Sequence, residues 1–151
     1  MKRSPVSSAR SRSNPISIPL TGRCQYGRVR YEIIGAPLKI TACHCVECQK
    51  QSGGAFGMAL WVKSGDLRIK GKPKSFTRTA DSGNPMTGVF CPDCGVRLYN
   101  IPSVDQNVYL LKPGTEDETS GVRPERMVCM RRNSTGSIFQ TTSNSLSRKR
   151  S

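Results

Sequence analysis

The central part of the chain alternates between short apolar segments and residues that favour turns. In residues 28–33 and 67–70, polar and apolar side chains alternate, which is typical of a strand with one buried face. Residues 55–62 form a nearly continuous apolar run, which we interpret as a buried strand. The same pattern predicts further strands at residues 38–42, 75–78, 87–90, 96–100 and 104–111.

Helical signals are weak in comparison. Residues 48–52 are compatible with one short helical turn, which Gly53 and Gly54 would end. No longer stretch has the periodicity of an amphipathic helix, and no long-period repeat is present. The pattern predicts a mostly β fold with antiparallel strands joined by turns, and with Phe56 and Trp61 as core residues.

The thiol groups of the chain are clustered. Cys43, Cys45 and Cys48 lie within six residues. Thiolates are soft ligands that suit Zn²⁺, and clustering favours ligation over scattered cysteines buried as apolar residues. On an extended segment Cys43 and Cys45 point to the same side, so their sulfurs can share an ion. His44 then points away, which favours a supporting or surface role over ligation.

A second cysteine pair follows later in the chain. Cys91 and Cys94 have the two-residue gap that lets a turn return the second sulfur to the metal of the first. Cys24 precedes both clusters, and Cys129 follows them as an expected free thiol. Glu47 lies inside the first cluster, where it is either a proton relay or a solvated loop carboxylate.

Length and composition limit the choice of protein class. The 151 residues suit one domain, and 35% hydrophobic content with a single Trp gives a thin core that metal sites would help to stabilise. No hydrophobic signal segment opens the chain, and seven cysteines, an odd number, do not suit a disulfide scaffold. We therefore expect a cytoplasmic protein in a reducing environment. No apolar stretch is long enough to cross a membrane.

The formal net charge of +14 is concentrated at the two ends. Residues 1–19 carry four basic residues, residues 131–151 carry five, and neither segment has an acidic residue. Both are rich in Ser, Asn and Thr, which predicts disordered basic tails at 1–19 and 129–151 around a domain at 20–128. Basic tails can bind nucleic acid weakly, but no interleaved aromatic residues or binding motif support nucleic acid as a partner.

Three segments carry a resemblance to a known family. Residues 21–27, 43–53 and 90–95 are similar, in order and spacing, to the glutathione-dependent formaldehyde-activating enzyme family, which includes centromere protein V. The resemblance extends from about Leu20 to about Arg126. It implies a twisted all-β, tent-like and Mss4-like zinc fold of stacked antiparallel sheets. It also implies a carbon–sulfur lyase that acts on glutathione adducts of aldehydes and binds two zinc ions.

The resemblance assigns six cysteines to the two zinc ions: Cys43, Cys45 and Cys48 to a catalytic site with an open position, and Cys24, Cys91 and Cys94 to a structural site. This division agrees with zinc chemistry, because catalytic zinc keeps an exchangeable position whereas structural zinc is closed by four ligands. Glutathione is anionic at neutral pH, so the net charge of +5 on residues 20–130 does not oppose its capture.

Two features depart from the family pattern. Tyr26 stands where the family has the second cysteine of an opening C-x-C. Because positions 24 and 26 of a strand face the same way, Tyr26 is expected to point toward the structural metal. A phenol with a pKa of about 10 is a poor zinc ligand, so this site has three thiols and water, another closing group, or no metal. After residues 123–126 the family continues into a His and an aromatic-rich segment, whereas this chain continues differently from Met127.

Two classes of function remain. The intact C-x-C-x-x-C favours a zinc-dependent lyase acting on glutathione–aldehyde adducts or related thiol conjugates, because a scaffold needs no under-coordinated metal. Tyr26 and the divergent end favour a non-catalytic zinc-fold binding module whose basic tails contact nucleic acid or other anions.

Overall fold

The computed structural model describes residues 17–80 and 82–128 of the chain. This part is built from short strands with one short α-helix. The strands are β1 (Leu20–Arg23), β2 (Arg30–Ile33), β3 (Lys39–Cys43), β4 (Gly57–Lys63), β5 (Leu67–Lys70), β6 (Lys74–Thr79), β7 (Pro85–Phe90), β8 (Arg97–Pro102), β9 (Val108–Leu111) and β10 (Arg126–Val128). Helix α1 spans Val46–Ser52, and two 3-10 segments are η1 (Ser64–Asp66) and η2 (Pro113–Thr115).

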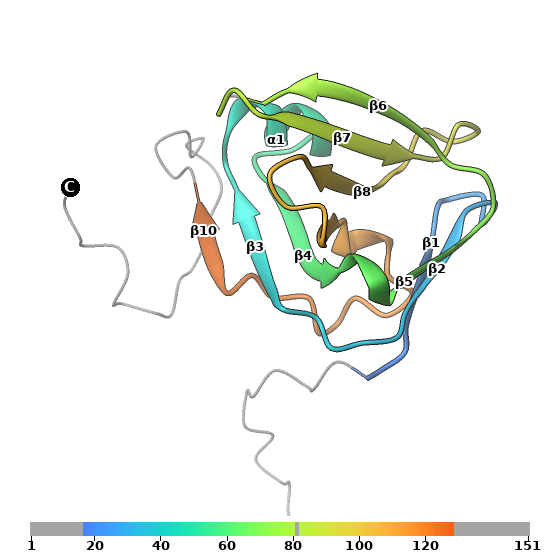
Figure 1. Cartoon of the computed structure of the whole chain (residues 1–151). Helices are drawn as coiled ribbons and strands as arrows, with labels where there is room; N and C mark the ends of the chain where they lie inside the picture. Colours follow the sequence, from blue (N-terminus) through green and yellow to red (C-terminus); the bar gives the residue numbers. More distant parts are fainter. Residues whose placement is uncertain (1–16, 81, 129–151) are drawn as a thin grey trace, which may run out of the picture.

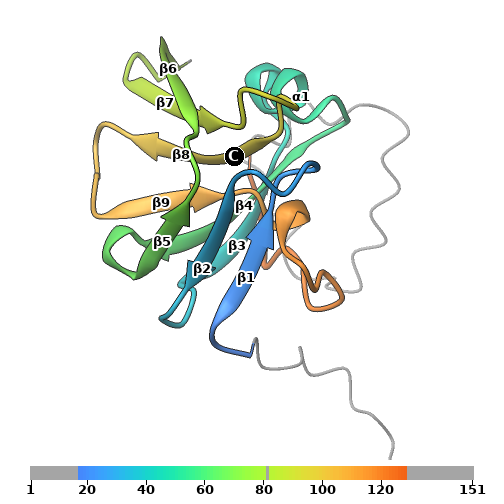
Figure 2. The ribbon, with the colours of Figure 1, turned by 90° about the vertical axis from the view of Figure 1, so that its right-hand side faces the viewer.

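The strands form two sheets (Figures 1 and 2). The smaller sheet has the order β1-β2-β5, and the larger has the order β10-β3-β4-β9-β8-β7-β6. Within the described residues the strand pairs are antiparallel, except that β10 runs parallel to β3. In Figure 2 the smaller sheet lies in front of β3 and β4, while α1 lies near β6 and β7 in Figure 1.

The core lies between the two sheets. Leu60 and Val62 of β4 are fully buried in one cluster with Tyr31 and Ile33 of β2. The intervening Trp61 is only partly buried, because successive side chains of a strand point to opposite faces. One face of the larger sheet is thus covered by the smaller sheet, and its other face is available for a site.

The mostly β fold is confirmed, and the strand pattern predicts most of the elements. Two short strands, β1 and β10, were not predicted. The predicted strand at 104–111 is too long, because β9 begins at Val108 and Val104 is 70% exposed. The side chain of Asp105 accepts a hydrogen bond from the N–H of Asn107 at 3.0 Å, which makes a turn of the intervening segment.

The predicted basic tails, 1–19 and 129–151, lie outside the described residues apart from residues 17–19, and so does Cys129. Among the helices of the described part, none has the length and apolar character that a membrane crossing requires.

Candidate metal centres and the adjoining cavity

Cys43, Cys45 and Cys48, called here the first thiol group, come together between the end of β3 and the first turn of α1. Their sulfur atoms all lie within 4.8 Å of one another. Zn–S bonds are about 2.3 Å long, so sulfurs on one tetrahedral zinc are about 3.8 Å apart. The three thiols can therefore close on a zinc ion with small shifts.

The backbone around α1 fixes the spacing of these thiols. Cys45 is the N-cap of α1, and its sulfur accepts a hydrogen bond from the N–H of Cys48 at 3.3 Å. The helix ends at Gly53, whose φ of 68° is a left-handed conformation that glycine adopts without strain. Cys43 pairs with Gly57 of β4, where an added Cβ would lie 3.1 Å from the Cβ of Cys48. The missing side chain at Gly57 lets α1 pack directly on the sheet.

Contacts among the three thiols shift their pKa values in different directions. The hydrogen bond between Cys43 and Cys48 raises the pKa of Cys43 and lowers the pKa of Cys48. Burial raises the pKa of Cys45. A divalent cation would favour the thiolate form of all three, because it takes the place of their protons.

Cys24, Cys91 and Cys94 form a second thiol group, whose sulfurs also lie within 4.8 Å of one another. Cys24 lies in the turn between β1 and β2, and the other two lie between β7 and β8, so the group joins the two sheets. Cys24 and Cys91 are only 1% and 0% exposed. The backbone of Val96 hydrogen-bonds to the thiol of Cys94 and is the main cause that lowers its pKa to about 7.

The expectation that Tyr26 points toward the second thiol group is wrong. Strand β1 ends at Arg23, and the N–H of Gly27 donates to the carbonyl of Cys24 at 3.0 Å, which makes a turn of this segment. The side chain of Tyr26 is 65% exposed. Its backbone, however, hydrogen-bonds to the thiol of Cys94 and lowers the pKa of that thiol. The backbone of residue 26 therefore supports the group while the phenol faces solvent.

His44 belongs to neither thiol group, as expected from its direction. It is 0% exposed, so the alternative of a surface role is wrong. Its ring centroid lies 5.5 Å from that of Phe56, and its backbone N–H donates to the carbonyl of Val128 at 3.1 Å. His44 thus packs in the interior against Phe56, and its backbone links the segment between Cys43 and Cys45 to β10.

A cavity of about 320 Å³ adjoins the first thiol group. Cys43, Cys45 and Cys48 all line it, whereas none of the three cysteines of the second thiol group does. The other side chains discussed below that line it are Thr41, Glu47, Gln51, Ala59, Trp61, Arg78, Ser82, Met86, Asn100, Leu110, Lys112 and Val128. The cavity lies on the face of the larger sheet that the smaller sheet leaves uncovered.

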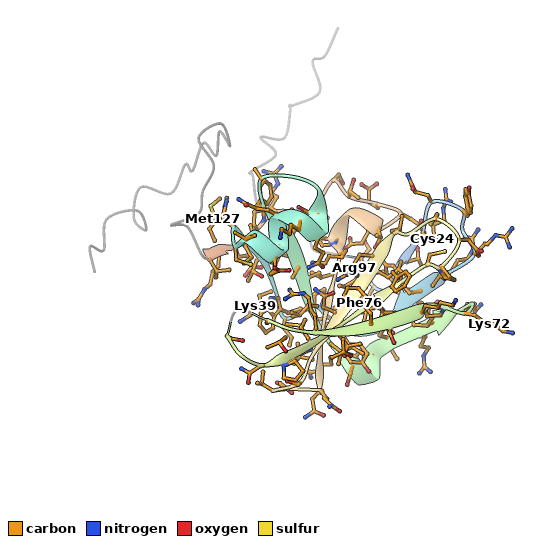
Figure 3. The ribbon with its side chains drawn as sticks, turned by 90° about the horizontal axis from the view of Figure 1, so that it is seen from above. Cys24, Lys39, Lys72, Phe76, Arg97 and Met127 are labelled. Atoms are coloured by element: carbon orange, nitrogen blue, oxygen red, sulfur yellow. The ribbon has the colours of Figure 1, made fainter. Side chains whose placement is uncertain are left out.

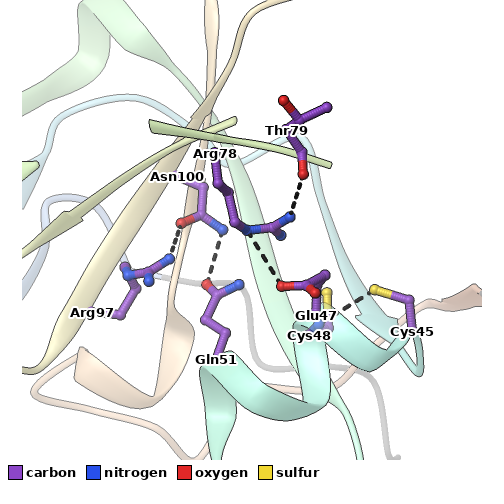
Figure 4. Close-up of polar contacts among 8 residues, drawn as sticks. All are labelled: Cys45, Glu47, Cys48, Gln51, Arg78, Thr79, Arg97 and Asn100. Atoms are coloured by element: carbon purple, nitrogen blue, oxygen red, sulfur yellow. Dashed lines mark hydrogen bonds and ion pairs between the residues drawn. The ribbon is translucent and has the colours of Figure 1, made fainter. Parts of the chain in front are cut away.

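Two polar contacts connect the sheet to α1 at this cavity (Figure 4). Nε of Arg78 on β6 lies 3.6 Å from Oε2 of Glu47, so Glu47 is neither free nor simply solvated. Nη1 of Arg97 donates to Oδ1 of Asn100, and Nδ2 of Asn100 donates to Oε1 of Gln51, both at 2.9 Å. These contacts hold the thiol-bearing helix against β6 and β8.

Arg97 is itself held in a fixed position. Its guanidinium lies 4.7 Å from the ring centroid of Phe76, and the two residues lie close together in Figure 3. A side chain at Gly88 would collide with this guanidinium, so the glycine makes room for it. Burial, and then the charge of Arg78, lower the pKa of Arg97.

Lys112 brings a largely buried ammonium group to the cavity. Its Nζ donates to the carbonyl of Met58 at 3.3 Å. Burial lowers the pKa of Lys112 to about 8, and the charge of the Cys48 thiolate is the largest cause that opposes this shift. The ammonium is therefore electrostatically coupled to the first thiol group.

Comparison with known proteins gives the family. A family model described as glutathione-dependent formaldehyde-activating enzyme matches residues 19–132. The chain belongs to this family. The match extends past β10, so the divergent segment after residue 126 lies within the family's domain, and Val128 in it lines the cavity. The two cysteine groups accord with a zinc-binding domain of the glutathione-dependent formaldehyde-activating type.

A crystal structure of a protein from Rhodobacter sphaeroides has the same fold. It aligns with a TM-score of 0.53 over 71% of this chain and 98% of its own length, at 18% sequence identity. No curated protein sequence matches the chain.

Several cavity residues of this family member were not identified from the sequence. The sequence predicts Trp61 as a core residue, whereas the structure places it in the lining of the cavity. The pattern could not distinguish the two faces of β4, because Ala59 and Trp61 on one face are as apolar as Leu60 and Val62 on the other. Lys112 follows two leucines at the end of β9, and a basic residue directly after an apolar strand is the signal that could have identified it.

Proposed function

We propose that this family member is a zinc-dependent carbon–sulfur lyase acting on adducts of glutathione, or of a related thiol, with aldehydes. The observation that carries the proposal is the different setting of the two thiol groups. The first thiol group lines a cavity, whereas Cys24 and Cys91 of the second are buried in the core. Three protein ligands beside an accessible space are typical of catalytic zinc, which keeps a position for a substrate atom.

In the proposed reaction the C–S bond of the adduct breaks. The hydroxyl group of the adduct loses its proton and its oxygen becomes the carbonyl oxygen of the aldehyde. The electron pair of the C–S bond stays on the sulfur, which takes up a proton and leaves as the thiol. Held by Cys43, Cys45 and Cys48, zinc would supply a positive charge that stabilises the departing sulfur.

Other side chains of the cavity support this chemistry. The ammonium of Lys112 is coupled to the first thiol group and adds positive charge where negative charge develops. The guanidinium of Arg78 can bind a carboxylate of glutathione, or of the related thiol, when it gives up its contact with Glu47. The hydrogen bonds from Arg97 through Asn100 to Gln51 keep α1, and with it Cys48, in position.

The second thiol group would hold a structural zinc ion between the two sheets. Its burial and its position at two turns suit a closed site that stabilises the fold. Both groups need reduced thiols as ligands, so the proposal places the protein in a reducing compartment such as the cytoplasm.

The test measures zinc content and turnover on the same preparations. The full chain should hold about two zinc ions and accelerate exchange between glutathione, formaldehyde and their adduct in NMR exchange spectra. Cys45→Ser should remove about one zinc ion and the exchange activity, and Cys91→Ser should remove the other zinc ion and lower the melting temperature. Cys129→Ser changes the expected free thiol and is the matched control. It should leave the zinc content, the exchange activity and the melting temperature unchanged.

Two outcomes would contradict the proposal. Unchanged zinc content in Cys45→Ser would exclude the first thiol group as a metal site. Full zinc content without exchange activity for any thiol adduct would instead favour a non-catalytic zinc-fold binding module.

A further inference from the structure

The polar side chains that line the cavity are already engaged within the protein. Arg78 pairs with Glu47, and the amide of Asn100 donates to Gln51. The ammonium of Lys112 donates to a backbone carbonyl. The remaining two are hydrogen-bonded as well: Thr41 accepts from the indole N–H of Trp61, and Ser82 accepts from Asn84. Apart from the thiols and the cations of Arg78 and Lys112, which keep unused N–H donors, a ligand that enters the cavity therefore meets mainly apolar surface.

This apolar surface follows the uncovered face of the larger sheet. Trp61 of β4 pairs with Leu110 of β9, and both line the cavity together with Ala59, which lies two residues before Trp61 on the same face. Met86 of β7 and Val128 of β10 extend the apolar lining to further strands. The polar atom of the indole is satisfied by Thr41, so the ring presents carbon atoms to the space.

The apolar surface also reaches well away from the first thiol group. Cys43 pairs with Gly57, and Trp61 lies four residues further along β4. At about 3.3 Å per residue, the backbones of Gly57 and Trp61 are about 13 Å apart. The indole N–H reaches back to Thr41, which lies two residues before Cys43 on β3, so the ring covers the sheet between these two positions. A hydroxymethyl group, which is what formaldehyde adds to a thiol, has a single carbon atom. A single carbon atom at the first thiol group leaves the apolar surface along Ala59, Trp61 and Leu110 uncovered.

The thiol part of the substrate does not suit this space either. Glutathione is composed of amide, carboxylate and ammonium groups, and burying such groups against carbon atoms without partners is strongly unfavourable. Arg78 and Lys112 are the cavity residues that attract its carboxylates. The apolar surface is therefore left for the part of the adduct that comes from the aldehyde.

On the basis of the function proposed above, we propose that the cavity selects thiol adducts of aldehydes with a hydrocarbon group of several carbons. In this arrangement the hydrocarbon group lies along Ala59, Trp61 and Leu110. The hydroxyl-bearing carbon and the sulfur remain at the first thiol group. Formaldehyde adducts would then be poor substrates, because they leave the apolar surface uncovered.

The test is a binding series with S-alkylglutathiones, thioethers that cannot release an aldehyde. Zinc-loaded full chain is titrated with the S-methyl, S-butyl and S-hexyl compounds, and binding is followed by calorimetry and by the fluorescence of Trp61. Trp61 is the only tryptophan of the chain, so the signal reports on this cavity. Affinity should rise by up to about fourfold for each methylene that becomes buried. The S-hexyl compound should bind at least tenfold more tightly than the S-methyl compound.

Two variants locate the effect. Leu110→Asn puts a polar group into the apolar lining and should remove most of the gain for S-hexylglutathione while leaving S-methylglutathione binding within about twofold. Val108→Asn, on the same strand but outside the cavity lining, is the matched control and should keep the gain. If a variant does not fold, the affinities of the unchanged chain for the S-methyl, S-butyl and S-hexyl compounds still test whether the cavity binds a hydrocarbon group.

The outcomes separate this inference from the proposed function. Equal affinities across the series overturn the inference, even where formaldehyde adducts are turned over. A steep rise with chain length, with loss of the gain in Leu110→Asn, supports it even where no adduct is turned over. In that second case the lyase proposal fails and the hydrocarbon site stands.

Discussion

Glu116 is a buried carboxyl group beside the smaller sheet, and its replacement by glutamine should make the protein more stable at alkaline pH. Glu116 is 8% exposed and directly follows η2, where it forms an isolated bridge with Gly22 of β1. Its Oε1 has no hydrogen-bond partner among the described residues. Burial raises its pKa from the ordinary 4.5 to about 7.

The sign of the effect follows from proton binding. A carboxyl group with a raised pKa binds its proton more tightly in the folded chain than in the unfolded chain. Its contribution to stability is fully present below about pH 4.5 and is lost as the pH rises through about 7. The pKa of Glu116 differs by about 2.5 units between the folded and the unfolded chain, and each unit corresponds to about 1.4 kcal/mol. At pH 8 the free energy of unfolding is therefore lower by about 3 kcal/mol than for a carboxyl group that stays protonated.

Glu116→Gln cannot ionise, so it keeps the neutral form at every pH. Its free energy of unfolding should exceed that of the parent by about 3 kcal/mol at pH 8 and by only about 1 kcal/mol at pH 5. Urea unfolding of the zinc-loaded proteins, followed by circular dichroism at both pH values, measures the difference. Asp117→Asn changes an exposed neighbour that accepts a hydrogen bond from Thr21, and it should cost less than about 1 kcal/mol at both pH values.

The reasoning is refuted by a Glu116→Gln protein whose gain is the same at pH 5 and pH 8. It is also refuted by a loss of stability at pH 8, which would show that the ionised carboxylate has a stabilising partner in the folded chain.

Three further predictions concern the thiol groups. Gly57→Ala should weaken zinc binding at the first thiol group about tenfold in chelator competition, because the new Cβ would lie 3.1 Å from the Cβ of Cys48 and displace α1. Tyr26→Cys should slow chelator removal of zinc from the second thiol group. The phenol of Tyr26 faces solvent, but the backbone of residue 26 contacts the Cys94 thiol, so the shorter cysteine side chain can rotate toward the group and close the site as a fourth thiolate. Lys112→Met should lower kcat about 100-fold without loss of zinc, because it removes a positive charge near the reacting sulfur.

Each of these predictions has a matched control. Gly65→Ala adds a methyl group where no atom lies within 4 Å, so it should leave zinc affinity unchanged. Lys72→Cys adds an exposed thiol on the loop before β6, which is not part of the second thiol group, and should not slow zinc removal. Lys63→Met removes an exposed cation of β4 and should leave kcat unchanged. Equal effects in a variant and its control would contradict the local explanation.

The strands that were missed from the sequence have identifiable physical causes. In β1 the inward positions are Leu20 and Gly22, and the second has no side chain to show the alternation. Gly22 is required there because a Cβ would overlap the hydroxyl of Tyr31. Strand β10 has three residues and exists through its parallel pairing with β3, a contact between distant parts of the chain that no local pattern reports.

The candidate site was predictable only in part, for a similar reason. The spacing of the cysteines identified the first thiol group and the pair Cys91 and Cys94, because ligand spacing is a local property of the chain. Cys24 is far from that pair in the sequence, and only the family resemblance assigned it to the second thiol group. The cavity is formed by residues such as Trp61, Arg78 and Lys112, which the sheet order brings together from separate strands. The position of Tyr26 was misjudged because a turn, which the strand pattern did not predict, directly follows β1.

The two thiol groups have the same number of sulfurs, and their surroundings decide what each can do. The second thiol group connects a turn of the smaller sheet to a turn of the larger one, on the side of Cys24 in Figure 3. An ion there would hold the two sheets together over their shared core, so its loss would cost stability first.

The first thiol group lies toward the opposite side, next to the strand that carries Met127, where α1 packs on the uncovered face of the larger sheet. An ion there would contribute less to joining the sheets and would be exposed to the cavity, so its loss would cost activity first. Under the proposed function, the fold would thereby separate a metal that maintains the structure from a metal that performs chemistry, and single cysteine substitutions would then tell the two roles apart.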